Sequence, residues 1–179
     1  MYFRSETQLR WRPLNRWRSA ELPPGWYPWL ADTGSLTRRL QAACPGELTV
    51  RVLFQGRDRP GGSEAAGLGL KPRQPVWVRE VQLCCNGQPW VFARTLVPAA
   101  TLRGRGRRLT RLGNRSLGEV LFSDSTVTRG AVEVARVGAA SWLHQRAWPG
   151  PRRDLRPLWG RRSLFWLAGR PLLVCELFL

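Results

Sequence analysis

The stretch that decides the fold runs from residue 76 to residue 97 and reads VWVREVQLCCNGQPWVFARTLV. Two runs rich in β-branched and aromatic residues, 76–85 and 88–97, flank Asn86-Gly87. Asn-Gly is favoured in the two-residue type I′ turns of hairpins, because both turn residues take a positive φ there. The stretch therefore predicts an antiparallel β-hairpin. A second hairpin is predicted at the end of the sequence, with strands over 161–167 and 171–179 around a turn at 168–170.

Two segments outside the hairpins also have the pattern of strands. Residues 47–55 alternate apolar side chains with more polar ones, which predicts a half-buried strand. Residues 125–136 return to a strand pattern. Together with the two hairpins, these segments give about six strands, a usual number for one sheet.

The helical segments are short. Residues 26–43 place apolar side chains at helical spacing and are interrupted near Gly34, which predicts two helices hinged there. Ser116, with Glu119 three residues later, forms a capping box at the start of another helical turn. Residues 56–72 are predicted to be a loop, and residues 138–160 an excursion from the core. The predicted fold class is α+β, a single antiparallel β-sheet with helices packed on one side.

The length of 179 residues favours one domain. Residues 1–25 mix Arg, Trp and Pro without a period and are interpreted as an N-terminal arm before a domain over 26–179. No stretch approaches the roughly 18 apolar residues of a membrane span. The first 18 residues carry five Arg and no apolar signal segment. A cytoplasmic location is the corresponding prediction, and a monomer is the expected state.

The formal net charge of +17 favours nucleic acid or an anionic surface as a partner. However, only Lys71 among the 29 basic residues is a lysine, an imbalance that is typical of a GC-rich coding genome. No nucleic-acid-binding motif accompanies the charge. No specific nucleic-acid partner is therefore predicted.

The four cysteines are Cys44, Cys84, Cys85 and Cys175, enough for two disulfides. A chain with room for a sizeable core needs no disulfide, and reduced thiols fit a cytoplasmic protein. The adjacent pair in the first hairpin is interpreted as buried, inert thiols. The cysteine spacing matches no zinc site, His144 is the only histidine, and no phosphate-binding loop is present. Neither a metal nor a cofactor is predicted.

Three charged residues interrupt the apolar pattern of the predicted strands. Arg79 and Arg94 each lie among apolar residues on one face of their strands, and Glu176 is the one charged residue in the run 172–179. A charge in such surroundings is costly unless it is paired. One interpretation is a buried Arg–Glu ion pair, or arginine side chains whose charged ends extend to an edge of the sheet. The other is a dry pocket in which Arg79 holds a ligand carboxylate and Glu176 meets a ligand hydroxyl.

Seven segments, in order from about Trp29 onward, resemble the bacterial chorismate pyruvate-lyase family, which converts chorismate to 4-hydroxybenzoate and pyruvate at the entry to ubiquinone biosynthesis. Each segment alone is weakly specific, whereas seven in order are specific. They are WL at 29–30 with SLTRR at 35–39, REVQLC at 79–84 with NGQPW at 86–90, ARTLVP at 93–98, SLG at 116–118 with LF at 121–122, STVTR at 125–129, WGRRS at 159–163, and GRPLL at 169–173 with ELFL at 176–179.

The resemblance implies an internal ligand cavity against the sheet and a lyase that needs no cofactor. Carried over by position, it implies that Arg79 binds the ring carboxylate with help from the backbone N–H groups of Leu36 and Leu117. It further implies that Glu176 hydrogen-bonds the 4-hydroxyl and that Arg94 lines the enolpyruvyl side. The implied catalytic residues are Arg79, Glu176 and Arg94, and the partners are chorismate and 4-hydroxybenzoate.

The sequence also departs from the family pattern. Ala93 replaces a glycine, Leu36 stands where a methionine is frequent, and residues 140–157 resemble an insertion that carries His144. The alternative function is a non-catalytic, effector-sensing module for small aromatic acids, because effector domains of some transcription regulators are similar to this fold. A third alternative, a basic nucleic-acid-binding protein, predicts steeply salt-dependent affinity.

Overall fold

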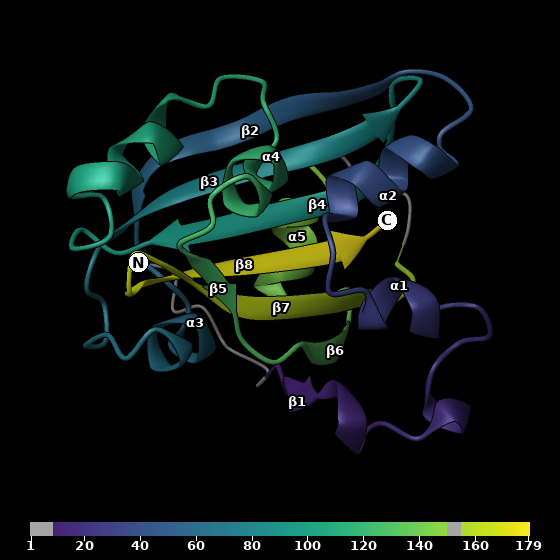
Figure 1. Ribbon diagram of the computed structural model, residues 1–179. Coiled ribbons are helices and arrows are strands. Elements are labelled where there is room, and N and C mark those ends of the chain that lie inside the picture. The colour runs from purple at the N-terminus through teal and green to yellow at the C-terminus, as the bar shows by residue number, and fades with distance from the viewer. Residues whose placement is uncertain (1–8, 150–154) are drawn as a thin grey trace.

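The computed structural model describes residues 9–149 and 155–179 and contains one antiparallel sheet (Figure 1). Its strand order is β1-β6-β7-β8-β4-β3-β2, and β5 pairs with β7 outside this path. The strands are β1 (Arg12–Pro13), β2 (Leu48–Asp58), β3 (Val76–Cys85), β4 (Gln88–Val97), β5 (Val127–Arg129), β6 (Glu133–Val137), β7 (Leu158–Leu167) and β8 (Arg170–Phe178). The predicted α+β class with a single antiparallel sheet is confirmed.

The sheet has eight strands where about six were predicted. One addition is the two-residue β1, which comes from the predicted arm and pairs with β6. The other arises because the predicted strand over 125–136 is broken at Gly130, whose N–H donates to the carbonyl of Leu164. Short strands of this kind form through contacts with distant strands, so the local pattern does not reveal them.

Both predicted hairpins are confirmed. β3 pairs with β4, and the turn residues Asn86 and Gly87 have φ of 49° and 80°. β7 pairs with β8, and the turn residues Ala168 and Gly169 have φ of 49° and 75°. A positive φ at both turn positions is the geometry that matches the twist of paired strands.

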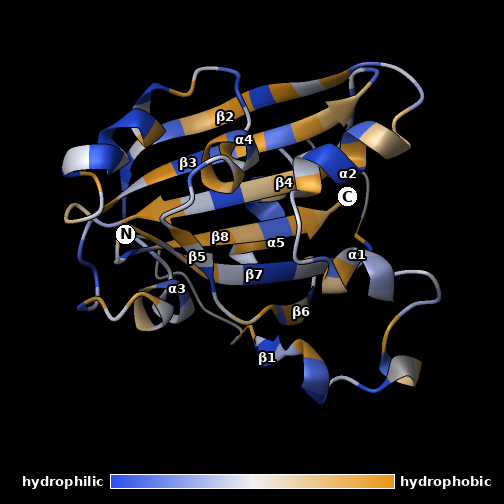
Figure 2. Ribbon diagram, in the orientation of Figure 1, coloured by the Kyte–Doolittle hydropathy of each residue, from blue (hydrophilic) through white to orange (hydrophobic). Residues whose placement is uncertain are grey.

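The sheet has two buried faces, because all ten residues of β3 are buried. We call the face of Arg79, Ala93 and Glu176 the front face, and the face of Glu80 and Arg94 the rear face. Side chains alternate between these faces along each strand. Polar bands therefore cross the middle of otherwise apolar strands such as β3, β4 and β7 (Figure 2).

Helices cover both faces of the sheet, which corrects the prediction that they pack on one side. On the front lie α1 (Tyr27–Ala31), α2 (Leu36–Ala43) and α4 (Leu117–Phe122); α3 (Gly62–Gly67) and α5 (Trp142–Ala147) lie on the rear (Figure 1). The 3-10 turns are η1 (Leu14–Arg16), η2 (Ser19–Glu21) and η3 (Gly104–Arg111). A strand that is apolar on both faces needs cover on both.

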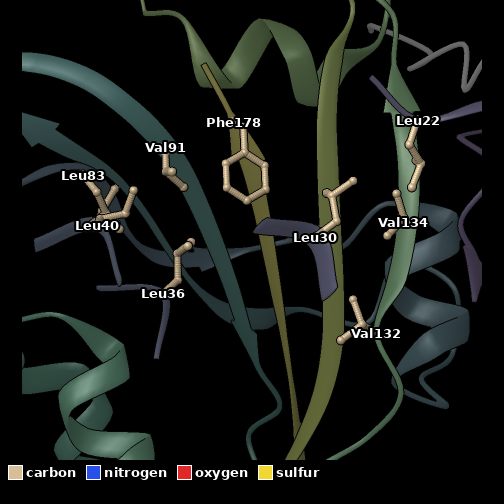
Figure 3. Close-up of a cluster of buried hydrophobic side chains, with 10 residues drawn as sticks. Leu22, Leu30, Leu36, Leu40, Leu83, Val91, Val132, Val134 and Phe178 are labelled. Carbon is tan, nitrogen blue, oxygen red and sulfur yellow. The ribbon is translucent and has the colours of Figure 1, made fainter. Parts of the chain in front are cut away.

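The predicted hinge at Gly34 separates α1 from α2. The carboxylate of Asp32 accepts the N–H of Gly34 at 2.7 Å, and the hydroxyl of Ser35 caps α2 by accepting the N–H of Arg38. The two helices bury Leu30, Leu36 and Leu40 against β3, β4 and β8 in one hydrophobic cluster (Figure 3). The capping of α4 by Ser116, through the N–H of Glu119, is also as predicted.

Three segments are more ordered than predicted. In 56–72, β2 continues to Asp58 and α3 follows, because Glu64 caps Gly61 and pairs with the sheet. In 138–160, α5 buries Leu143 and Ala147 in the rear core, so this segment is not an excursion; residues 150–154 of it lie outside the described residues. Leu22 of the predicted arm is buried in the front cluster, while residues 1–8 are not described.

The cysteines differ from the prediction of reduced thiols. Cys44, which ends α2, forms a disulfide with Cys85 at the end of β3. Cys84 and Cys175 are buried free thiols, as interpreted for Cys84. Adjacent strand residues face opposite sides of the sheet, so only Cys85 meets the helix. Which of the two adjacent cysteines pairs with Cys44 therefore depends on the face on which α2 docks.

Within 9–149 and 155–179, no helix has the length and apolar character needed to cross a bilayer.

Candidate functional site

A cavity of about 50 Å³ lies between the front face of the sheet and the N-terminal ends of α2 and α4, and we call it the front cavity. Four strands of the sheet each contribute a residue to its lining. These residues are Arg79 of β3, Ala93 of β4, Arg161 of β7 and Glu176 of β8. Leu36 and Leu117, the first residues of the two helices, also line it. The fold thus brings together Leu36, Arg79, Leu117 and Glu176, four of the five residues singled out from the sequence.

The two helix ends can approach closely because residue 118 is glycine. A Cβ built on Gly118 would lie 3.1 Å from the hydroxyl of Ser35 and 3.3 Å from that of Thr37. The N–H groups of a first helical turn have no partner inside the helix. Both Leu36 and Leu117 therefore carry backbone donors at the wall of the cavity.

Arg79 carries an unpaired donor at the front cavity. Its side chain is buried, and Nη2 donates to the carbonyls of Gly113 at 2.7 Å and Arg115 at 3.0 Å. Its Nε is buried and has no hydrogen-bond partner. Among the described carboxylates, none forms an ion pair with Arg79, and burial lowers the pKa of this guanidinium. Arginine stays charged in proteins, so the site holds a cation that lacks a counter-ion.

Glu176 is held by an arginine that the sequence reasoning missed. One carboxylate oxygen, Oε2, accepts from Nε of Arg161 at 2.6 Å across the β7–β8 ladder. Nη1 of Arg161 also donates to the carbonyls of Trp29 at 2.8 Å and Asp32 at 2.7 Å. The ion-pair interpretation therefore applies to Glu176, with Arg161 as its partner. Oε1 accepts no hydrogen bond within the described part of the chain.

Arg129 of β5 is a second lining residue that the sequence reasoning missed. Both Arg129 and Arg161 lie in segments that resemble the family, STVTR at 125–129 and WGRRS at 159–163. The signal that could have found Arg129 is its place in the otherwise uncharged run 125–132, whereas Arg161 lies next to Arg162 and has no such signal.

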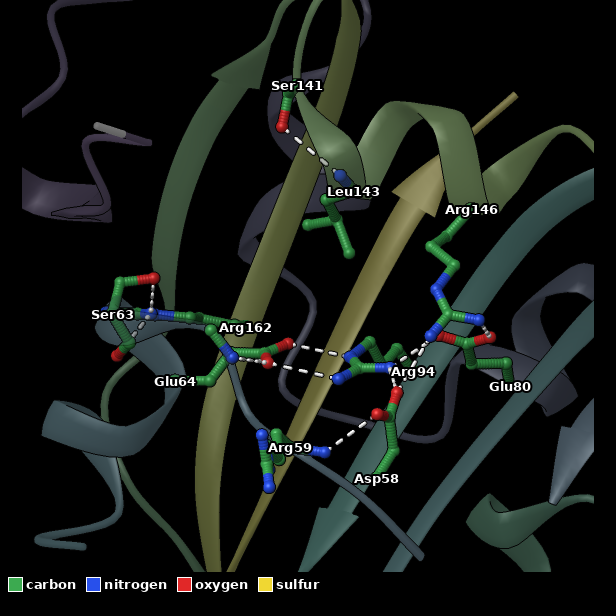
Figure 4. A network of polar contacts seen from close by, with 11 residues as sticks. Asp58, Arg59, Ser63, Glu64, Glu80, Arg94, Ser141, Leu143, Arg146 and Arg162 are labelled. Atoms are coloured by element: carbon green, nitrogen blue, oxygen red, sulfur yellow. Dashed lines mark hydrogen bonds and ion pairs between the residues drawn. The ribbon is translucent and has the colours of Figure 1, made fainter. Parts of the chain in front are cut away.

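Arg94 lies on the rear face, away from Arg79 and Glu176. Its Nε is 2.9 Å from Oε1 of Glu64, and its Nη1 is 2.5 Å from Oε1 of Glu80 (Figure 4). Arg146 of α5 extends this network to Asp58 and Glu80. The register of β3 and β4 places Arg94 opposite Glu80, and successive residues of a strand point to opposite faces. The front cavity therefore does not include Arg94.

A larger cavity, of about 260 Å³, lies on the rear face. Its buried charged residues are already paired, Glu64 with Arg94 and Arg162 with Glu133 at 2.8 Å. Cys175 also lines it, and burial raises the pKa of this thiol, so that it stays neutral and unreactive. The unpaired donor of Arg79 makes the front cavity the better candidate for a ligand site.

No group of three or more His, Cys, Asp and Glu side chains suited to a metal ion occurs in residues 9–149 and 155–179. His144 is buried in α5, where its Nε2 is 3.0 Å from the carbonyl of Arg156.

Ala93 stands opposite Glu176 in the β4–β8 ladder and keeps a negative φ, so the loss of glycine there causes no backbone strain. Its methyl group instead takes up space at the wall of the front cavity.

Comparisons with known proteins show the family to which the chain belongs. The family model described as chorismate lyase matches residues 9–179. A protein of Methylococcus capsulatus named "Probable chorismate pyruvate-lyase" is 47% identical over 152 residues, which cover 84% of this chain and 92% of that protein. A protein of the same name from Aromatoleum aromaticum is 41% identical and covers 98% of this chain and 92% of its own length.

Solved structures share the fold at low sequence identity. The effector domain of PhnF from Mycobacterium smegmatis has a TM-score of 0.54 at 18% identity and covers 82% of this chain and 89% of that domain. The ligand-binding domain of a GntR-family regulator from Bordetella bronchiseptica has a TM-score of 0.51 at 24% identity and covers 75% and 85%. These similarities concern the fold, whereas the family model and the sequence relatives span nearly the whole described chain. The chain therefore belongs to the chorismate lyase family.

Proposed function

We propose that this protein is a chorismate pyruvate-lyase that converts chorismate to 4-hydroxybenzoate and pyruvate without a cofactor, as the first step of ubiquinone biosynthesis. One observation carries the proposal: in a member of the chorismate lyase family, Arg79 lines the front cavity and its buried Nε has no hydrogen-bond partner. A carboxylate is the ligand group that best fits a free guanidinium N–H, because a hydrogen bond between two charged groups is stronger than one between neutral groups.

The proposal assigns a role to each residue of the front cavity. Arg79 binds the ring carboxylate, and the backbone N–H groups of Leu36 and Leu117 support it. Glu176 accepts the hydrogen bond of the 4-hydroxyl through Oε1, since Oε2 is taken by Arg161. Arg94, which was expected at the enolpyruvyl side, lies behind the sheet. Its role in the proposal is to fix β4 beside Glu176.

The reaction suits a site made of arginines and a carboxylate. The C3–O bond of chorismate breaks, the ring loses the hydrogen of C4, and the enolpyruvyl methylene gains a hydrogen to become the methyl group of pyruvate. Aromatisation of the ring makes this step strongly favourable. The protein then needs to orient the dianion and to stabilise the negative charge that moves toward the ether oxygen. Arg161 and Arg129 supply positive charge in the same cavity.

The front cavity must widen for a ligand to enter. Its volume is about 50 Å³, and one water molecule occupies about 30 Å³ in the liquid. The cavity is therefore far smaller than an aromatic acid. The N-terminal ends of α2 and α4 form its cover. Ligand exchange is therefore expected to require these helices to separate, and such steps set the turnover of many enzymes.

The test is to mix the purified protein with chorismate in metal-free buffer and to identify the aromatic product by chromatography. Formation of 4-hydroxybenzoate with an equal amount of pyruvate supports the lyase and its independence of a metal. No turnover, with saturable binding of 4-hydroxybenzoate, would support the effector-sensing alternative, which the shared fold favours.

The other expectations stay predictions. Light scattering checks whether the protein is a monomer. The salt dependence of DNA binding checks the nucleic-acid prediction, because a steep dependence would indicate a nucleic-acid-binding protein. A cytoplasmic location is in tension with the Cys44–Cys85 disulfide, because a reducing compartment keeps most thiols reduced. The redox state of this pair in cells tests it.

A further inference from the structure

The charged side chains that line the front cavity do not balance. They are the guanidinium groups of Arg79, Arg129 and Arg161 and the carboxylate of Glu176. Glu176 pairs with Arg161, which leaves two positive charges without a counter-ion in the lining. Asp32 lies near Arg161 and Arg129, but its carboxylate pairs with Arg39 at 3.1 Å.

Arg129 is the second of these unpaired cations. Its Nε donates to the hydroxyl of Ser163 at 3.1 Å, and its Nη1 donates to the carbonyl of Asp32 at 3.3 Å. No carboxylate of the described chain forms an ion pair with it. Burial, together with repulsion from Arg161, lowers the pKa of Arg129. A half-buried cation held only by neutral groups is less stable than one paired with a carboxylate, and an incoming anion supplies the missing counter-ion.

The position of Arg129 relative to Glu176 indicates which part of the substrate it meets. Arg129 interacts electrostatically with both members of the Arg161–Glu176 pair, and its partner Ser163 follows Arg161 by two residues on the same face of β7. The 4-hydroxyl assigned to Glu176 and the ether oxygen of the enolpyruvyl group are on adjacent ring carbons of chorismate. The enolpyruvyl carboxylate therefore lies at the Glu176 end of the ligand.

We propose that Arg129 binds the enolpyruvyl carboxylate, so that the front cavity selects a dianion with one carboxylate at Arg79 and the other at Arg129. This inference rests on the proposed function. It assigns to Arg129 the contact that the family resemblance implied for Arg94, which lies on the rear face. The aromatic product keeps only the ring carboxylate, so Arg129 distinguishes the substrate from 4-hydroxybenzoate.

The experiment compares two ligands in Arg129→Met and Arg79→Met. For Arg129→Met, we expect the KM for chorismate to rise at least about tenfold, while the Kd for 4-hydroxybenzoate changes less than about threefold. For Arg79→Met, we expect both constants to rise. Arg129→Lys keeps the charge and should restore part of the chorismate affinity. Arg136→Met, an exposed strand arginine on β6, is the matched control and should change neither constant.

Two results would overturn the inference: an unchanged KM for chorismate in Arg129→Met, or an equal loss of affinity for both ligands in a variant whose thermal unfolding matches the wild type. Failure of the proposed function can be distinguished from failure of this inference. If the wild type binds chorismate without turning it over, the lyase proposal fails, and the Kd values of chorismate and 4-hydroxybenzoate, measured by calorimetry, still decide whether Arg129 selects the dianion.

Discussion

The two faces of the sheet bury the same kinds of charged residue in opposite ways. On the rear face, Arg94 is fully buried between Glu64 and Glu80, so each charge meets an opposite charge within hydrogen-bonding distance (Figure 4). On the front face, Arg79 has a buried Nε without a partner, and Arg129 has only neutral partners. The difference teaches that burial of a charge does not identify a site, whereas burial without a counter-ion does.

The largest expected effect is on the rear face. Arg94→Met leaves the buried Glu64 without its cation and Glu80 with Arg146 alone, and removal of one partner of a buried ion-pair network costs about 3–5 kcal/mol. We expect this loss in the free energy of unfolding, measured in urea. A loss below about 1 kcal/mol, with an unchanged urea midpoint, would contradict the view that the rear network holds the fold.

The next effect concerns the cover of the front cavity. Cys44 and Cys85 are 41 residues apart, and a cross-link over such a loop contributes about 3–4 kcal/mol in the chain-entropy model. Reduction, or the double substitution Cys44→Ser and Cys85→Ser, is expected to lower the unfolding free energy by up to this amount. Cys84→Ser, in which the disulfide is kept, is the control. Equal stability of the oxidised and reduced protein would count against the disulfide as a tie between α2 and β3.

Loss of the front cation is expected to impair catalysis more than stability. Arg79→Ala removes the proposed carboxylate contact, and we expect kcat/KM for chorismate to fall about 100-fold, or about 2.7 kcal/mol. The unfolding free energy should change much less than in Arg94→Met, because no carboxylate is left unpaired. A decrease in kcat/KM below about tenfold would exclude Arg79 as the carboxylate-binding residue.

The smallest effect lies outside both faces, at Asp124 just beyond α4. Hydrogen bonds from the hydroxyl and N–H of Thr126, with the neighbouring Arg108, lower the pKa of Asp124 from 3.8 to about 2. A lowered carboxyl pKa contributes stability above pH 3.8 that is lost as the pH falls toward 2. Asp124→Asn is expected to flatten the stability profile in this window without changing kcat/KM at neutral pH. An unchanged profile between pH 2 and pH 4 would contradict this assignment.

Local chemistry explains what could be predicted. The turn at Asn86-Gly87 follows from the preference for positive φ, and the cap of α4 follows from Ser116 and Glu119. Arg79 and Glu176 stood out because strand alternation places them among apolar neighbours, and the fold brings both to the front cavity. Arg94 stood out for the same reason, yet alternation along one strand does not say which face of the finished sheet a residue occupies.

The sequence by itself determined the elements whose causes lie within a few residues: the two hairpins, the two helices on either side of Gly34 and the helix capped by Ser116. Together these elements indicated the α+β class. Only the tertiary structure decided the partners, because they lie far apart in the chain: Arg161 with Glu176, Arg94 with Glu64, and Cys44 with Cys85. Arg129 meets the carbonyl of Asp32 across 97 residues. The periodicity of the sequence does not predict such contacts, because they depend on how helices dock on a sheet. The balance of charge in the front cavity is therefore a property of the folded protein.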